Sequence, residues 1–125
     1  MEKTQSKWKK APQNQVDFFN QTLVSHPEVE KRQMFGYPCA FLGGNMFFGL
    51  FEDSVFLRLS SEDREEIQRE NLATPFEPMP GKVMKEYVRL SPAAVQDEGM
   101  FLPWFERSRV FTAHLPVKVK NGSKK

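Results

Sequence analysis

Cysteine and histidine are scarce in this sequence of 125 residues. Cys39 is the one cysteine, and His26 and His114 are the two histidines. A single cysteine excludes an intramolecular disulfide and is typical of proteins from a reducing compartment. A zinc site needs several nitrogen or sulfur ligands at suitable spacing, and these three residues form no such cluster. We therefore expect no metal site and a cytoplasmic location.

Long apolar segments are also missing. A transmembrane helix needs about 20 consecutive apolar residues, and the sequence has no comparable run without a charge. Residues 1–10 are polar and charged, and they lack the apolar core of a secretory signal peptide. We expect neither export nor a membrane partner.

Positive charge is scarce in the body of the chain, although the formal net charge is +2. Eight of the 18 lysines and arginines lie in residues 1–10 and 118–125. Residues 11–117 carry ten basic and fifteen acidic side chains, so this part is acidic and would repel a nucleic acid backbone. We expect one folded domain at residues 12–116, between a flexible basic leader (1–11) and a flexible basic tail (117–125). Direct nucleic-acid binding should be weak and confined to these ends.

Phenylalanine and glycine, by contrast, are concentrated in residues 34–51. Strand periodicity is found at residues 31–35, 39–42 and 46–51, with breaks at residues 36–38 and at the Gly43-Gly44-Asn45 turn. Both faces of the strand at residues 46–51 are apolar. This strand should therefore be central in its sheet, with each face covered by a helix or by a second copy of the chain.

Helical patterns flank this strand region. Residues 12–24 and 103–115 have apolar side chains at helical spacing, and Ser60 is a suitable cap for a helix that runs to about residue 71. Residues 55–59 and 83–90 predict further strands, and Ser91-Pro92 predicts a short helical turn that Gly99 ends. We expect an α+β fold in which an antiparallel sheet of five to six strands is flanked by helices, in the order helix, four strands, helix, one or two strands, helix. The last helix should place a stripe of side chains in the core: Phe101, Trp104, Phe105, Ser108 and Phe111.

No catalytic set is visible in the sequence. The apolar neighbours of Cys39 indicate burial, which raises a thiol pKa and makes the thiol inert. The Gly43-Gly44-Asn45 turn lacks the Lys-Ser/Thr ending of a phosphate-binding loop. We expect no enzymatic activity.

Arg58, Tyr87 and Arg89 are the candidate ligand or partner residues. Strand alternation places them on one sheet face beside Phe56, where they could bind a carboxylate or another anion. In the alternative interpretation, these side chains form cross-strand pairs with acidic neighbours.

Several motifs resemble those of the N-terminal domain of the TfoX/Sxy competence-regulator family. They are Met34-Phe35-Gly36, the hairpin at residues 41–47, the strand at residues 55–59, Pro75-Phe76 and residues 84–87. The resemblance covers residues 12–116, and its motif residues are Met34, Phe35, Gly36, Gly44, Phe47, Leu57, Phe76 and Tyr87. The sequence departs from the family pattern at Tyr37-Pro38-Cys39 and has no counterpart of the second, helical domain of full-length regulators.

The resemblance implies an antiparallel sheet flanked by helices, a homodimer, and neither catalytic residues nor a cofactor. In full-length members it also implies a role in switching on DNA-uptake genes alongside the cyclic-AMP receptor protein. Our leading hypothesis is a non-enzymatic, homodimeric domain that acts as a regulatory adaptor through an unidentified protein partner. Two alternatives stay open: a small-ligand or peptide-binding domain that uses Arg58, Tyr87 and Arg89, and an unrecognised enzyme.

Overall fold

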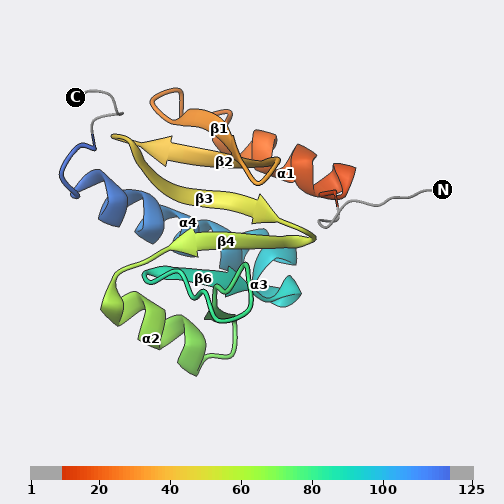
Figure 1. Cartoon of the computed structure of the whole chain (residues 1–125), viewed down its shortest axis with the longest axis vertical. Coiled ribbons are helices and arrows are strands. Elements are labelled where there is room, and N and C mark those ends of the chain that lie inside the picture. The colour runs from red at the N-terminus through yellow and green to blue at the C-terminus, as the bar shows by residue number, and fades with distance from the viewer. Residues whose placement is uncertain (1–9, 119–125) are drawn as a thin grey trace.

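Six antiparallel strands form one sheet in the computed structural model, which describes residues 10–118 (Figure 1). The strand order across the sheet is β1-β2-β3-β4-β6-β5, and every neighbouring pair is antiparallel. This arrangement confirms the α+β class and the predicted number of strands. The strands are β1 (Glu30–Met34), β2 (Tyr37–Leu42), β3 (Asn45–Phe51), β4 (Ser54–Arg58), β5 (Ala73–Pro75) and β6 (Tyr87–Leu90).

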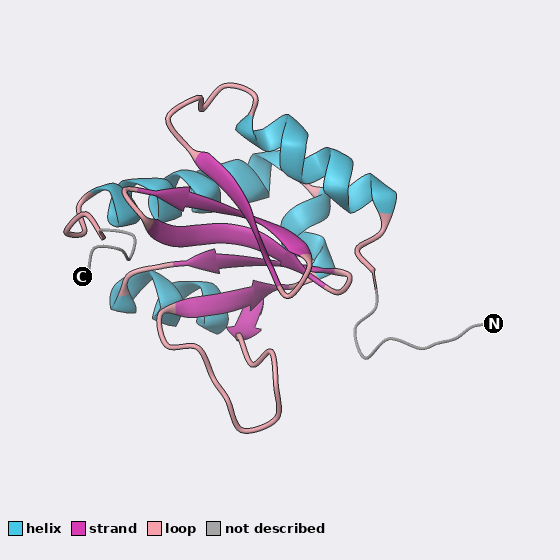
Figure 2. Ribbon diagram, turned by 45° about the horizontal axis from the view of Figure 1, so that its top comes forward, coloured by secondary structure: helices cyan, strands magenta, loops and turns pink. Residues whose placement is uncertain are grey.

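Four helices accompany the sheet: α1 (Gln13–Leu23), α2 (Ser61–Arg69), α3 (Pro92–Gln96) and α4 (Glu98–Ala113). Helices α1 and α4 pack against β3 on one face of the sheet, and α3 packs between α4 and β6 (Figures 1 and 2). Helix α2 contacts β5 at the opposite edge of the sheet from β1. No helix within residues 10–118 has the length and apolar composition that are needed to cross a membrane.

Local sequence signals explain where several elements begin. The Ser60 hydroxyl accepts a hydrogen bond from the Asp63 N–H at 3.2 Å and caps α2, and the Ser91 hydroxyl caps α3 in the same way. Gly43 and Gly44 have φ angles of 60° and 82°, which form the tight turn between β2 and β3. The predicted caps and the predicted hairpin are therefore confirmed.

The turn between β1 and β2 lies earlier than predicted. It is formed by Phe35 and Gly36, whose φ angles are 57° and 83°, whereas the sequence predicted a break at residues 36–38. Tyr37 and Pro38 belong to β2 and pair with Met34 and Gln33 of β1. Pro38 is tolerated because it lies at the start of β2, before Cys39, where the pairing with β3 begins.

Helix α4 begins at Glu98, five residues before its predicted start, and it contains both Gly99 and Pro103. The Asp97 carboxylate accepts a hydrogen bond from the Gly99 N–H at 3.0 Å, so an aspartate cap starts the helix where a glycine break was expected. Pro103 removes one helical hydrogen bond, but the burial of Phe101 on the preceding turn stabilises the segment.

The predicted core stripe of α4 is correct except at its end. Phe101, Trp104, Phe105 and Ser108 are buried, but Phe111 is only half-buried and Thr112 is buried instead. Phe111 and Thr112 lie three and four residues after Ser108, so helical spacing allows either one to continue the stripe. In the structure it is Thr112 that is buried.

The predicted strand at residues 83–90 is also shorter in the structure, where only Tyr87–Leu90 form β6. Glu86 interrupts the extended backbone because its φ angle is 74°, in the left-handed region. Residues 76–86 therefore form a long connection between β5 and β6 instead of additional strand.

The face of the sheet that carries α1 and α4 holds a cluster of aromatic side chains. Phe48 of β3 lies at the centre, with ring centroids 5.0 Å from Phe19, 5.9 Å from Phe101 and 5.2 Å from Phe105. All four rings are buried. This cluster joins both helices to the central strand.

The second apolar face of β3 is not covered by a helix, which was one of the two covers that the sequence suggested. It is covered by Phe76, from the connection that follows β5. The Phe76 ring stacks on Phe56 at 4.7 Å with an interplanar angle of 13°, and it meets the edge of Phe51 at 5.5 Å. Phe56 in turn lies over Gly49, whose lack of a side chain makes room for the ring. The single chain therefore fills both faces of its central strand.

The basic leader and tail predicted from the sequence lie outside the described residues, except at residues 10–11 and 117–118. At the C-terminal end, the Lys118 N–H donates to the Gly43 carbonyl at 2.8 Å. The Asn45 amide donates to the Pro116 carbonyl at 3.0 Å. The last described segment therefore lies beside the β2–β3 turn.

Candidate functional site

The three candidate residues Arg58, Tyr87 and Arg89 lie on the same face of the sheet. Arg58 of β4 is directly opposite Tyr87 of β6, and Phe56 is opposite Arg89. The two arginines nevertheless line different depressions, one at each end of this strand pair. The structure brings Arg58 and Tyr87 together and separates both from the surroundings of Arg89.

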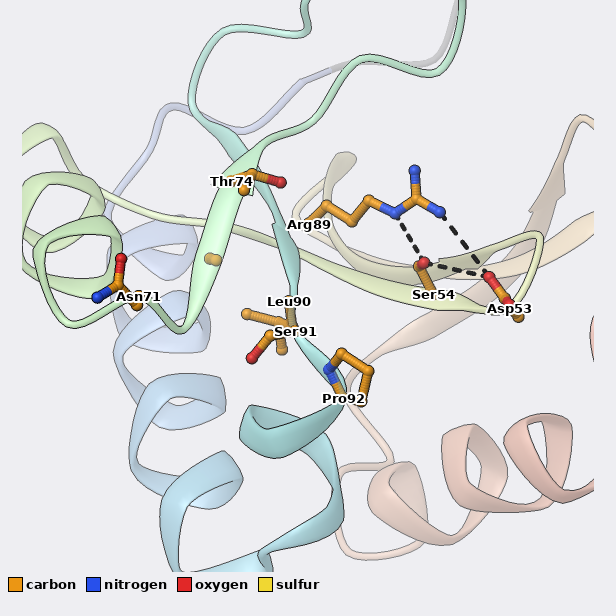
Figure 3. Close-up of a pocket in the computed structure, with 9 residues that line it drawn as sticks. Asp53, Ser54, Asn71, Thr74, Arg89, Leu90, Ser91 and Pro92 are labelled. Carbon is orange, nitrogen blue, oxygen red and sulfur yellow. Dashed lines mark hydrogen bonds and ion pairs between the residues drawn. The ribbon is translucent and has the colours of Figure 1, made fainter.

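The depression at Arg89 has a volume of about 420 Å³, and six of its nine lining residues are polar or charged (Figure 3). The Arg89 Nε–H donates to the Ser54 hydroxyl at 2.7 Å, and Nη2 lies 3.8 Å from the Asp53 carboxylate. This arginine is held by an acidic neighbour, as the alternative interpretation of the sequence proposed. Its charge is balanced, so the depression offers little net attraction to an anion. The remaining polar lining residues are Asn71, Thr74 and Ser91.

A second depression of about 580 Å³ lies between α2 and the connection that leads into β6. We call it the basic cleft, because three basic side chains and one acidic side chain line it. Such an excess of positive charge contrasts with the acidic balance of residues 11–117. Its lining residues are Arg58, Arg64, Gln68, Pro75, Val83, Met84, Lys85, Glu86 and Tyr87.

Arg58 is held in place from two directions. Its Nε–H donates to the Glu86 carboxylate at 2.8 Å, its Nη2 lies 2.6 Å from the same oxygen, and its guanidinium carbon lies 5.5 Å from the centre of the Tyr87 ring. Glu86 is itself fixed, because its carbonyl accepts a hydrogen bond from the Leu59 N–H at 2.8 Å. The left-handed backbone at Glu86 thus turns the chain while its side chain orients Arg58.

Arg64 and Lys85 are the two basic residues of the cleft that the sequence analysis missed. Arg64 and Gln68 are four residues apart on α2, so they share one face of the helix. One Arg64 Nη1–H donates to the Leu59 carbonyl at 2.7 Å. Lys85 is exposed and has no ion-pair partner among residues 10–118. The helical spacing of Arg64 and Gln68 was a usable signal, but only the path of the β5–β6 connection brings Lys85 to them.

Tyr87 has a structural hydrogen bond. Its hydroxyl donates to the Met46 carbonyl at 2.9 Å, which ties β6 to the start of β3 across β4. Burial raises the pKa of Tyr87 above its ordinary value, and the nearby Arg58 only partly opposes this effect. The phenol is therefore neutral at physiological pH and offers the cleft its ring rather than a charge.

Cys39 is fully buried beneath the second sheet face. Burial raises the pKa of the Cys39 thiol to about 11, and Arg32 only partly opposes the shift. The thiol is therefore protonated and unreactive in the folded domain. This agrees with its predicted role as a core residue.

The histidines lie apart from Cys39. His26 Nδ1 is 3.5 Å from a Glu28 carboxylate oxygen, and His114 Nδ1 is 2.8 Å from the Val110 carbonyl. Within residues 10–118 there is no group of three or more histidine, cysteine, aspartate or glutamate side chains that could hold a metal ion.

The family motif residues mainly serve the fold. Phe35, Gly36 and Gly44 form turns with positive φ angles. Phe47, Leu57 and Phe76 are buried, whereas Met34 is half-buried and Tyr87 lines the basic cleft. The motif therefore describes the hairpins and the core better than it describes a binding site.

The fold is that of an α+β domain built on one open antiparallel sheet, with helices packed on one face. Comparison with protein families gives a match to the TfoX N-terminal domain over residues 21–111. The chain belongs to this family. Neither the curated proteins nor the solved structures gave a significant match.

Proposed function

We propose that this chain is a non-enzymatic regulatory domain that acts by binding another protein, as an adaptor related to the competence regulators. Membership of the TfoX N-terminal family supports a competence-regulator-like domain. The observation that carries the finer proposal is the basic cleft, which concentrates positive charge and exposed apolar surface on one open side of an acidic domain. We place its activity in the cytoplasm as part of the same proposal.

The chemistry of the described residues supports a binding role over a catalytic one. Nucleophilic catalysis needs an activated nucleophile within hydrogen-bond reach of a base. Cys39 is buried with a raised pKa, and Tyr87 uses its hydroxyl on a backbone carbonyl. The Arg58–Glu86 pair is a salt bridge whose partners neutralise each other, without a second carboxylate that would separate acid and base roles.

The adaptor role is tested by affinity capture with the tagged 125-residue chain as bait in its native cell, followed by mass spectrometry. An unrelated acidic domain of similar size, with the same tag and the same basic ends, is the control bait. We expect at least one protein to be retained by this chain alone and to bind again when both proteins are purified. If no protein passes both steps, the adaptor proposal fails.

A homodimer is part of the proposal and is supported by the family resemblance. The second face of β3, which first suggested a twin subunit, is covered by Phe76 and does not require one. Light scattering on the purified chain at micromolar concentrations tests the dimer. A strictly monomeric mass over the whole concentration range would refute this part and leave the adaptor role untouched.

Binding of a small anion is the second candidate, because Arg58 and Tyr87 line the same cleft. Arg89 lies in the other depression, so its replacement is the matched control. Arg58→Ala should reduce the rise in melting temperature that a carboxylate or phosphate ligand causes, and Arg89→Ala should not. Equal ligand-induced shifts in both variants would reject this candidate.

A further inference from the structure

We propose that the basic cleft is the partner site of this domain and that it binds a peptide segment that carries carboxylate side chains next to an apolar one. This inference rests on the proposed adaptor function and specifies its contact surface. The occupant is a segment of another protein chain, and the recognised groups are its carboxylates and one apolar side chain.

The charge of the cleft selects for an anion of limited size. Arg58, Arg64 and Lys85 face one opposing carboxylate, that of Glu86. Beyond the cleft the domain is acidic, so a long polyanion such as a nucleic acid would be repelled outside this spot. A short segment with a few carboxylates matches the positive charge of the cleft and does not extend over the acidic surface that would repel it.

The hydrogen-bond donors of the cleft are partly unused. Arg58 donates to the Glu86 carboxylate. Arg64 donates one N–H to the Leu59 carbonyl and has no further partner among the described residues. Lys85 likewise has none within residues 10–118. Arg64 and Lys85 can therefore receive carboxylates without breaking an existing ion pair.

The apolar part of the cleft favours a peptide over a free small anion. Val83 lines the cleft with 53% of its surface exposed, and Pro75 is an exposed lining residue as well. A phosphate or a free carboxylate would leave both in water. An apolar peptide side chain would cover them, and this burial of apolar surface stabilises the complex.

The probe is a set of short synthetic peptides labelled with fluorescein, in which glutamates and leucines are placed in a Gly/Ser background. One matched set has glutamine in place of every glutamate, and another has serine in place of every leucine. Fluorescence anisotropy is measured with the 125-residue chain, and inorganic phosphate and a single-stranded DNA oligonucleotide are added as competitors. We expect peptides that carry both residue types to bind more tightly than either matched set.

Lys85→Glu is the diagnostic variant and Lys82→Glu is its control. Both lysines are exposed on the same connection, but only Lys85 lines the cleft. Reversal of a charge that contacts the ligand should weaken binding by about tenfold, whereas the control should change it less than about twofold. Thermal melting of both variants verifies that they are folded.

The same pair of variants separates the two proposals in the capture experiment. If wild type and Lys82→Glu retain the partner and Lys85→Glu loses it, the cleft assignment is supported. If all three baits retain the partner, the adaptor function stands and the cleft assignment is wrong. If phosphate displaces the peptide at equal concentration, or if glutamine peptides bind equally well, the peptide proposal is overturned. If neither a partner nor a peptide binds, both proposals fail.

Discussion

Gly49→Ala should destabilise the domain, although alanine is usually the better strand residue. A Cβ atom at position 49 would lie 2.6 Å from Cζ of Phe56 and 2.9 Å from Cβ of Cys39. Both residues are fully buried. Phe76 stacks on the outer side of the Phe56 ring at 4.7 Å, so the ring cannot simply move outward.

The expected loss follows from two opposing effects. Overpacking of a close-packed core costs about 1–3 kcal/mol, because neighbours leave their preferred rotamers. Replacement of glycine lowers the entropy of the unfolded chain and returns about 0.5–1 kcal/mol. The contact with Phe56 Cζ is short enough to place the cost in the upper half of this range, so the net loss in the free energy of unfolding is about 1–2.5 kcal/mol. For a domain of this size it corresponds to a fall in melting temperature of roughly 4–10 °C.

Urea unfolding followed by far-UV circular dichroism measures the change, and thermal melting provides a second value. Gly99→Ala is the control, since Gly99 lies in the first turn of α4 with an ordinary φ angle and the new Cβ would approach no atom closer than 3.4 Å. This variant should be as stable as wild type or more stable. The double variant Gly49→Ala with Phe56→Leu should lose less stability than the sum of the single changes. If Gly49→Ala is as stable as wild type, the layered packing of the second sheet face is wrong.

Three further predictions concern other parts of the domain. Gly44→Ala should lower stability by about 1–3 kcal/mol in urea unfolding, because its φ angle is 82° and a Cβ would clash with the Lys118 carbonyl; an unchanged midpoint would contradict the contact. Phe76→Ala should cost about 3–5 kcal/mol and expose Cys39 to a thiol reagent, and continued protection of the thiol would show that other groups cover this face. The raised pKa of the Cys39 thiol means that the unfolded chain releases its proton first as the pH rises, so this contribution to stability is present below about pH 9 and is lost towards pH 11. The pH dependence of urea unfolding checks this sign, and Cys39→Ala should have a shallower decline over the same range.

The parts of the fold that were predictable are those that depend on neighbouring residues. The Gly43-Gly44 turn, the Ser60 cap and the central position of β3 all follow from local conformational preferences and from the period of apolar side chains. The start of α4 was not predictable in this way, because the Asp97 cap and the burial of Phe101 outweigh the helix-breaking tendencies of Gly99 and Pro103.

The candidate site was predictable to a similar extent. Alternation along two strands was enough to place Arg58 and Tyr87 on one face. Arg64 and Lys85 join them only because the backbone turns sharply at Glu86 and returns beside α2. Such a path depends on tertiary contacts, and no local pattern in the sequence encodes it.

The two outer strands of the sheet bear on how this domain can associate. Strand β1 presents Glu30, Lys31 and Arg32 along one edge, and β5 at the other edge is three residues long and ends at Pro75. Charged side chains, short length and proline all discourage a foreign strand from adding to a sheet edge. The domain is thereby guarded against edge-to-edge aggregation, and we expect a partner or a second copy to meet its side chains instead of extending its backbone ladder.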